Sequence, residues 1–369
     1  MQRRHFLKLG ALAPLLSLKS NLLQAETTMS LAPPAKLDET WREYEISLEV
    51  HPIADEGAVQ VWLPMPAENL SNMQTISKQS TWEVSAGGSA QLLTLAPYQV
   101  PVLSVKWPSE SRERFIKVNN YIKTRDVHID LEKPISSLQL SEAEKNLYLR
   151  ATKYLPTGNE VKKVIDRILT GKEHTAIDKV RAIYEWVVDN TSRNPKTQGC
   201  GTGNVEQMLT SGQLNGKCAD INGLFVALCR AAGVPARDIY GIRIDDSRLG
   251  YKSLGKYGDI SKAQHCRAEF FAEGFGWIPA DPADVRKVIL EEEPGGLTTI
   301  DPKVQAARKL LFGAWEMNWM AYNVGHDLLL PGLDHDIPYL MYPNGLTEKG
   351  MLDSLDPSKF RYQILSKRL

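Results

Sequence analysis

The stretch NGKCADINGLFVALCRAAG, residues 215–233, decides the fold of this 369-residue chain. Its apolar residues recur at helical spacing and predict one buried helix stripe: Ile221, Leu224, Phe225, Leu228, Cys229 and Ala232. Gly233 and Pro235 would end the helix, because glycine suits a helix C-cap and proline cannot continue a helix. Cys218 lies three residues before Ile221, so it shares the stripe at the first turn of the helix.

A cysteine in that position is favoured as a thiolate. The helix N-terminus carries partial positive charge and unpaired N–H groups. A free thiol titrates at about 8.5, and such a site lowers that value. Gly216 lets the backbone turn tightly and approach a substrate, whereas Lys217 and Asp220 are predicted to point elsewhere and stay in water. The thiolate of Cys218 still needs a proton acceptor.

A later segment can supply this acceptor. HCRAEFFAEGFGWIPADP, residues 265–282, is typical of two strands that turn near Glu273 and Gly274. A turn centred on Glu273 places His265 opposite Asp281, and directly opposed residues lie on the same face of a sheet. The carboxylate would hold one ring nitrogen of the imidazole and leave the other for the thiol. Cys218, His265 and Asp281 therefore form a candidate catalytic triad.

These segments carry a family resemblance. GKCADINGLFVALCRAAGVPAR, QHCRAEFF and GWIPADPA resemble the core of bacterial transglutaminase-like proteins, within the papain-like group of cysteine enzymes. The resemblance covers residues 145–285, and residues 312–332, FGAWEMNWMAYNVGHDLLLPG, are similar to the tail of the same group. It implies that Cys218 is the nucleophile, His265 the general base and acid, and Asp281 the carboxylate that orients the imidazole.

The oxyanion of such a reaction needs hydrogen-bond donors, and the backbone N–H of Cys218 is a natural one. The candidates for a second donor or a substrate contact are Gln207, Gln213, Asn215 and Gly216, and the sequence does not choose among them. Animal transglutaminases, which resemble this core, use an upstream tryptophan. Trp186 lies too deep in a predicted helical stripe to be given that role.

No cofactor and no metal are expected. Zinc would find suitable ligand types in Cys200, Cys218, His265 and Cys266, but no C-x-x-C or H-x-x-x-H spacing occurs. Moreover, strand neighbours such as His265 and Cys266 point to opposite faces. The animal enzymes depend on calcium, but no EF-hand-type loop is present, and Asp245–Asp246 is interpreted as a solvated turn. Cys200 could be an exposed loop thiol, a disulfide partner of Cys266 or part of a substrate loop.

The rest of the chain divides into segments with different residue patterns. Residues 1–25 combine Arg3–Arg4, a short apolar run and Ala25, which is typical of an export signal and resembles the twin-arginine type. Residues 26–40 read as a linker. Residues 41–135 alternate apolar and polar residues in short strands, which predicts a β-sandwich domain. Residues 140–290 are predicted as the catalytic core and residues 291–369 as a C-terminal extension packed on it. The fold class is therefore α+β, a transglutaminase-like core preceded by a β-sandwich.

Composition narrows the function classes. The 44 basic and 44 acidic residues balance, with no long run of either sign, which argues against nucleic acid as a partner. We expect an exported or periplasmic enzyme without a stable membrane span after signal removal, acting on a peptide or protein of the cell envelope. It would attack amide bonds through a thioester, and whether water or an amine accepts the acyl group stays open, as does the oligomeric state. The alternative is a non-catalytic peptide- or polysaccharide-binding module on the same fold.

Overall fold

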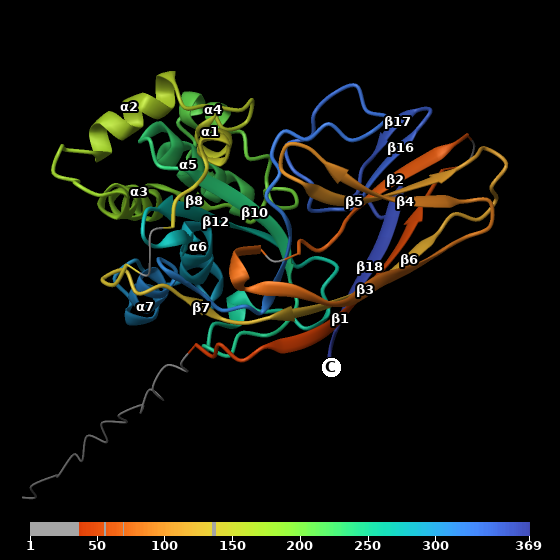
Figure 1. The fold of residues 1–369 in the computed structure, drawn as a ribbon, viewed down its shortest axis with the longest axis horizontal. Helices are drawn as coiled ribbons and strands as arrows, with labels where there is room; N and C mark the ends of the chain where they lie inside the picture. Colours follow the sequence, from red (N-terminus) through yellow and green to blue (C-terminus); the bar gives the residue numbers. More distant parts are fainter. Residues whose placement is uncertain (1–36, 55–56, 69, 135–137) are drawn as a thin grey trace, which may run out of the picture. The chain divides into compact units, whose positions relative to one another are not determined.

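The fold is taken from a computed structural model that describes residues 37–54, 57–68, 70–134 and 138–369. The predicted export signal and residues 26–36 of the predicted linker lie outside the described residues. In Figure 1, two five-stranded sheets lie on the right of the described part, and the helices with a four-stranded sheet lie on the left.

The strand-rich N-terminal segment forms most of a β-sandwich, as its alternating pattern predicts. One sheet has the order β11-β18-β1-β6-β3, with β11 at Gly258–Asp259, β18 at Phe360–Arg368, β1 at Arg42–Pro52, β6 at Ile116–Thr124 and β3 at Gln74–Val84. The other has the order β17-β16-β2-β5-β4, with β17 at Gly350–Leu352, β16 at Asn344–Thr347, β2 at Val59–Pro64, β5 at Val100–Trp107 and β4 at Ser89–Leu95. The alternating apolar residues of β1 are all buried: Tyr44, Ile46, Leu48 and Val50.

The end of the chain differs from the predicted extension, because it does not pack on the core alone. Strand β18 lies between β1 and β11, and β16 pairs with β2. The sandwich is therefore built from both ends of the described chain. A strand is stable in a sheet only when its backbone groups are paired, and these late strands supply partners that residues 41–135 lack.

The core combines seven described helices with a mixed set of strands. The helices are α1 (Glu142–Leu149), α2 (Asn159–Ile168), α3 (Ala176–Asn190), α4 (Val205–Ser211), α5 (Cys218–Ala231), α6 (Pro282–Glu291) and α7 (Pro302–Leu310). A four-stranded sheet has the order β13-β12-β10-β15, with β13 at Gly276–Ala280, β12 at Gln264–Ala272, β10 at Ala236–Arg243 and β15 at Trp319–Asn323. Short pairs join β14 (Ala314–Trp315) to β7 (Val127–His128), and β8 (Ser192–Arg193) to β9 (Asn215–Gly216). Single 3₁₀ turns lie at Leu70–Asn72 and Lys252–Leu254.

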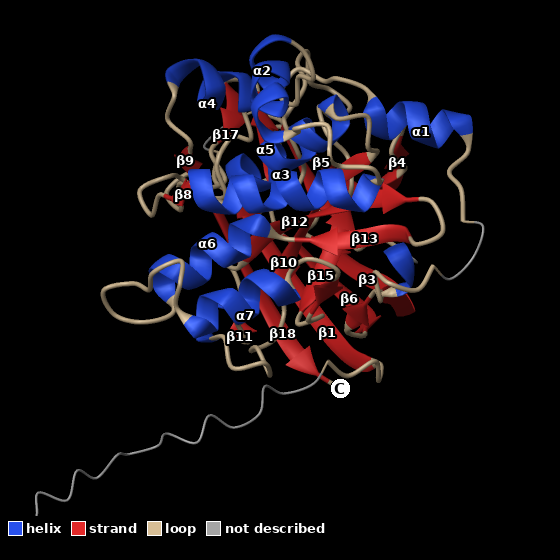
Figure 2. Cartoon of the chain, turned by 90° about the vertical axis from the view of Figure 1, so that its left-hand side faces the viewer, coloured by secondary structure: helices blue, strands red, loops and turns tan. Residues whose placement is uncertain are grey.

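Helix α5 is the centre of the core. Every residue from Cys218 to Arg230 is buried, and the helix packs on β12 and β10 as well as on α2, α3 and α6. Figure 2 shows the helices in front of the strands of this sheet. A helix that is buried on all sides is held by surrounding elements rather than by one amphipathic face. Gly233 follows with φ +79°, the left-handed conformation expected of the residue that ends the helix.

The hairpin of β12 and β13 forms as predicted, but its register differs by two residues. Ala268 pairs with Ala280 and Ala272 with Gly276, so the turn is centred on Gly274 rather than on Glu273. Gly274 has φ +82°, which explains why the chain turns there. Because side chains on a strand alternate with a period of two, a shift of two residues keeps Asp281 on the predicted face.

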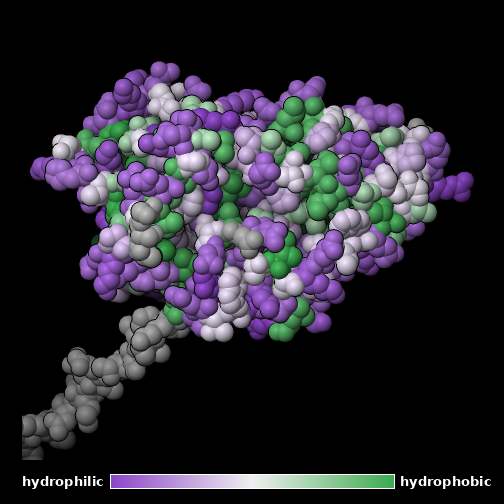
Figure 3. Space-filling view, in the orientation of Figure 1, coloured by the Kyte–Doolittle hydropathy of each residue, from purple (hydrophilic) through white to green (hydrophobic). Residues whose placement is uncertain are grey.

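No helix in the described part of the chain combines the length and the apolar character that crossing a bilayer requires. On the face drawn in Figure 3, hydrophilic and hydrophobic side chains are interspersed.

Candidate active site

Cys218 is the first residue of α5, and its side chain lies in the wall of a cleft of about 1090 Å³. His265 lines the same cleft, at the second residue of β12. Among the hydrogen bonds of the described residues, none uses the backbone N–H of Cys218. This N–H is therefore free to donate to a ligand beside the thiol, as expected at a helix N-terminus.

His265 is held by a carboxylate at one ring nitrogen. Its Nε2 lies 2.8 Å from Oδ2 of Asp281, and both side chains are buried. The indole Nε1–H of Trp319 donates to the backbone carbonyl of His265 at 2.9 Å, which fixes the start of the strand. Since Nε2 is engaged, the second ring nitrogen, Nδ1, is the one left for Cys218. The structure thus brings together the three residues that the sequence singled out.

Asp281 takes its place from helix α6, for which it is the N-cap. Its Oδ1 accepts the backbone N–H of Asp284 at 3.0 Å and the side-chain amide of Asn222 at 3.1 Å. The same amide nitrogen of Asn222 also donates to the carbonyl of Cys266 at 2.9 Å. The oxygen of Asn222 accepts the N–H of Ala283 at 3.1 Å. One buried amide therefore joins α5, β12 and α6 around the carboxylate, a role that the sequence analysis missed.

A second carboxylate, which the sequence analysis also missed, lies beside the imidazole. Oδ1 of Asp284 is 3.3 Å from Nε2 of His265 and 2.5 Å from Nη2 of Arg243. Arg267 Nε is 3.8 Å from Asp281. The spacing Asp281-x-x-Asp284 is the one signal that could have revealed it, because residues at the N-cap and at N3 meet at a helix start.

These surroundings shift the titration of the imidazole. Burial disfavours the charged ring, but the carboxylates of Asp284 and Asp281 outweigh it and raise the pKa of His265 to about 9. Burial and the neighbouring Asp284 also raise the pKa of Asp281, while Arg243 and His265 outweigh burial and hold the pKa of Asp284 well below its usual range. At neutral pH the ring is therefore an imidazolium.

The thiol of Cys218 shifts in the opposite direction. Burial alone would raise its pKa, but the polar groups of Cys200, Cys266 and His265 beside it lower the pKa well below its usual value. The pKa of Cys200 is raised by its contact with Cys218 and by burial. The pKa of Cys266 is raised mainly by burial and also by Cys218. Cys218 is thus the one of the three cysteines whose thiolate is favoured.

One of the three cysteines near the site differs from the sequence-based expectation in its orientation, and the pairing of the cysteines is now defined. Cys266 and His265 both reach Cys218, although neighbours on a strand were expected to face apart. Both stand at the beginning of β12, the strand on which α5 packs. All four cysteines are free and buried, so Cys200 and Cys266 form no disulfide and Cys200 is not an exposed loop thiol. Cys200 instead donates from its thiol to the carbonyl of Gln264 at 3.3 Å and accepts the hydroxyl of Tyr342 at 3.1 Å.

Asp220 is not the solvated residue that the sequence pattern indicated. It is buried, and its carboxylate accepts the backbone N–H of Lys217 at 2.9 Å, of Thr202 at 3.1 Å and of Gly203 at 3.0 Å. It therefore ties the loop of Cys200 to the start of α5. A Cβ at Gly216 would lie 2.2 Å from this carboxylate, so the glycine is needed for close packing against Asp220.

The predicted oxyanion and substrate residues lie in different places. Gln207 on α4 and Gln213 after it are exposed and do not line the cleft. Asn215 pairs its side-chain oxygen with the amide of Asn194 at 2.9 Å, and Gly216 is buried beneath the loop. Gln198 and Gln264 line the cleft instead. The side-chain amides in the cleft are therefore not those that the sequence analysis selected.

The surroundings of His265 are unfavourable for binding a metal ion. His265, Asp281 and Asp284 are the group of described residues with ligand atoms close enough to hold a metal ion. However, these atoms are already paired with one another, and the guanidinium groups of Arg243 and Arg267 lie against the two carboxylates.

Asp245 also differs from the expected solvated turn. It is buried, and its carboxylate accepts hydrogen bonds from Arg368 at 2.9 Å and from Tyr44 at 2.8 Å.

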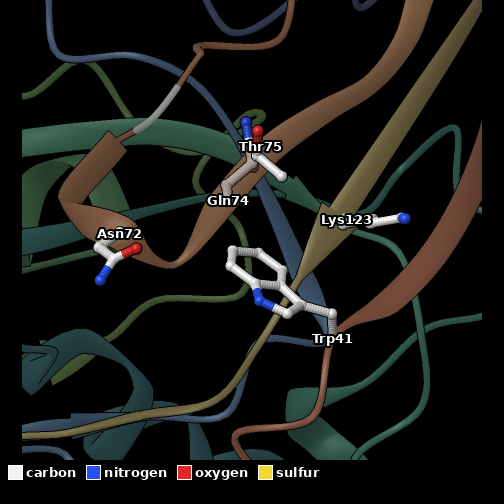
Figure 4. A pocket seen from close by; sticks show the side chains of 5 residues that line it. All are labelled: Trp41, Asn72, Gln74, Thr75 and Lys123. Carbon is white, nitrogen blue, oxygen red and sulfur yellow. The ribbon is translucent and has the colours of Figure 1, made fainter.

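Other polar features are less suited to chemistry. A second pocket, of about 540 Å³, is lined by Trp41, Asn72, Gln74, Thr75 and Lys123 on the sandwich (Figure 4). It contains no thiol or imidazole, and the side chain of Gln74 is already hydrogen-bonded to the backbone of Ala321.

The aromatic and amide residues of the C-terminal tail are buried, in keeping with a packing role: Trp315, Asn318, Trp319, Tyr322, Asn323 and His326.

Comparison with known proteins relates the core of the chain to one superfamily. Residues 162–282 match the model of the transglutaminase-like superfamily. A Haemophilus influenzae protein, described only as uncharacterized, is 36% identical over 381 residues, which cover 98% of this chain and 100% of that protein. A solved structure from Cytophaga hutchinsonii, named as a candidate cysteine protease, has a TM-score of 0.51 and 16% identity and covers 80% of this chain and 96% of its own, a likeness in fold. The chain therefore carries a domain of the transglutaminase-like superfamily over residues 162–282.

Proposed function

We propose that the protein is a cysteine enzyme that cleaves amide bonds of peptides or proteins through a thioester on Cys218. The observation that carries this proposal is the buried pair of His265 and Asp281, 2.8 Å apart, beside a thiol whose pKa is lowered well below its usual value. An activated thiol next to an oriented imidazole, in an open cleft, fits nucleophilic catalysis. A purely structural cysteine needs neither partner.

The steps follow from the positions of the groups. The Cys218 thiolate attacks the amide carbonyl carbon, and the backbone N–H of Cys218 donates to the resulting oxyanion. His265 gives its Nδ1 proton to the leaving nitrogen as the carbon–nitrogen bond breaks and the thioester remains. Water then attacks the thioester, His265 takes a proton from it, and the acid product leaves as the thiolate is restored. Asp281 keeps Nε2 protonated and the ring oriented throughout.

Hydrolysis is the favoured outcome over transfer to an amine. The cleft of about 1090 Å³ is lined mostly by polar and charged side chains, so water reaches the thioester. Transamidation requires a site that excludes water before the amine attacks. Release of free acid with no amide product in the presence of a primary amine would support hydrolysis, whereas dominant amide formation would assign a transglutaminase.

The first experiment is the rate of iodoacetamide labelling at each cysteine against pH, read by peptide mass spectrometry, in wild type and in His265→Ala. Cys218 should label fast below pH 7 in wild type, because it is a thiolate there, and should lose this advantage in the variant. Cys229, buried in the same helix with its pKa raised well above the usual value by burial, is the internal control and should stay unlabelled. A profile at Cys218 like that of a free thiol in both proteins would favour the binding module instead.

Catalysis itself is tested with Cys218→Ala and Asp281→Asn on a peptide library with a fluorescent amide leaving group. We expect a loss of at least about 10³-fold in kcat/KM for Cys218→Ala, because the thioester cannot form. Asp281→Asn should lose less, since the nucleophile remains. Hydrolysis that persists in Cys218→Ala would contradict the proposal.

Export belongs to the same proposal. Arg3–Arg4, the apolar run after Lys8 and Ala25 support a twin-arginine route to the periplasm. Cell fractionation of wild type and of Arg3→Lys with Arg4→Lys tests it, because the paired arginines are what the export receptor reads. Retention of the double variant in the cytoplasm is expected, and equal export of both proteins would argue for another route.

A further inference from the structure

The cleft beside Cys218 is much more basic than the chain as a whole. The chain carries 44 basic and 44 acidic residues, yet among the described residues only Glu49 and Asp259 contribute carboxylates to the lining of the cleft. Apart from Arg243, whose charge is paired with Asp284, six basic side chains line it: Arg193, Lys217, Lys256, Lys262, Lys287 and Arg361. A balanced composition therefore coexists with a concentrated positive field at the proposed reaction centre.

Three of these cations belong to the core and line the same cleft as Cys218. Lys217 directly precedes Cys218 and has no ion pair among the described residues. Arg193 and Lys287 both pair with Glu291, the latter at 3.8 Å, so one carboxylate serves two cations. Net positive charge thus remains next to the thiolate.

The opposite side of the cleft comes from the sandwich and the loop before β12. Arg361 on β18 and Lys262 are exposed, and neither forms an ion pair within the described part of the chain. Lys256 is also exposed but lies close to Asp259, which offsets part of its charge. The two carboxylates of the cleft are themselves engaged, Glu49 with Lys117 at 2.9 Å and Asp259 with Ser261 at 2.6 Å. Cations therefore stand on both sides of the thiol with few internal partners.

We infer that the cleft selects acidic peptides, with Lys217, Lys287 and Arg193 receiving a carboxylate on one side of the scissile amide and Lys262 and Arg361 one on the other. This inference rests on the proposed function, in which the substrate is a peptide. In a peptide, the groups that carry negative charge near an amide bond are carboxylates. Exposed charge pairs each change affinity by about 1.5- to 5-fold, so a peptide that meets several cations gains roughly 10-fold or more. The gain falls with salt, since exposed charges are screened.

The test compares kcat/KM for two fluorogenic peptides that differ only in glutamate or glutamine on both sides of the cleaved bond. Wild type should prefer the glutamate peptide, and the preference should shrink as salt rises. The double variant Lys262→Gln with Arg361→Gln should lose the share of the preference that comes from its side of the cleft. The control variant is Lys172→Gln, an exposed lysine that does not line the cleft and should keep the wild-type ratio. Equal rates for both peptides in wild type, or an unchanged ratio in the double variant, would overturn the inference.

A labelling experiment separates this inference from the proposed function. The ratio of iodoacetate to iodoacetamide labelling at Cys218 reports the charge of the cleft without any peptide. We expect the ratio to fall in the double variant and not in Lys172→Gln, while His265 is intact in all three proteins. A thiol that is slow with both reagents would defeat the proposed enzyme. A thiol that is fast with both but has the same ratio in every protein would defeat only the choice of acidic peptides.

Discussion

At the scale of single residues, the site depends on how two carboxylates share one imidazole. Nε2 of His265 faces Asp281 at 2.8 Å and Asp284 at 3.3 Å, and both are buried. The carboxylates of Asp284 and Asp281 together outweigh burial and raise the pKa of His265 to about 9. The thiolate–imidazolium pair therefore exists between the low pKa of Cys218 and about pH 9, and it is lost above that as the ring gives up its proton.

Replacing Asp284 by asparagine should move the alkaline limit of activity to lower pH. The change removes a negative charge 3.3 Å from the ring and leaves Arg243 closer to unopposed, so both effects lower the pKa of His265. The pH dependence of kcat/KM measures it. Asp189→Asn, which changes an exposed carboxylate paired with Arg308, is the matched control and should keep the wild-type limit. An unmoved limit in Asp284→Asn would mean that Asp284 does not act on the imidazole.

At the scale of elements, the start of α5 is set by a single buried carboxylate. Asp220 accepts three backbone N–H groups, one from the helix start and two from the loop after Cys200. The carbonyl of Cys200 in turn accepts the N–H of Ala219 at 2.9 Å. Burial raises the pKa of Asp220, and the hydrogen bonds oppose that rise. The loop thiol and the nucleophile are held together by this junction.

Asp220→Asn should reduce kcat/KM by about 10- to 100-fold, because an amide has only one acceptor oxygen and the loop loses its fixed position. A purely electrostatic role predicts the opposite sign, since removing a negative charge near Cys218 would favour the thiolate. Steady-state kinetics with iodoacetamide labelling separate the two. The control is Asp178→Asn in α3, where the carboxylate likewise accepts a backbone N–H of the N-cap, at 3.1 Å. That variant should lose stability and keep its activity.

At the scale of the whole described molecule, the end of the chain is part of the fold rather than an addition to the core. Strand β18 pairs with β1 along its length, and Ile364 stands opposite Leu48. Arg368 near the C-terminus and Tyr44 on β1 both bond to Asp245, which follows the core strand β10. The same strand also lines the cleft with Arg361. The last strand therefore connects the sandwich, the core and the proposed substrate side.

Ile364→Ala should lower the free energy of unfolding by about 2–5 kcal/mol, because it removes a side chain that is 1% exposed between two packed sheets. Its neighbour Leu365 is 42% exposed, so Leu365→Ala in the same strand should change the free energy of unfolding by no more than about 0.5 kcal/mol. Urea denaturation of both variants measures the difference. Equal small losses would mean that β18 is not a structural strand of the sandwich.

The parts of this fold that the sequence predicts are those set by local periodicity. The apolar spacing of residues 215–233 predicts α5, the alternation along β1 predicts its buried face, and Gly274 with its neighbours predicts a hairpin. The candidate triad follows from these elements, because each of its residues stands at an element boundary. Even the two-residue error in register left Asp281 on the right face, since strand side chains repeat every two residues.

Only the tertiary structure decided the rest. Asp220 and Asp245 look like surface residues in sequence, yet one accepts three backbone N–H groups and the other closes a contact between strands far apart in the chain. The second carboxylate at His265, the group of three thiols and the basic cleft likewise join segments that are distant in sequence. Periodicity reports which face of an element is buried, but the partner of a buried polar group is chosen in three dimensions, where it must find its hydrogen bonds.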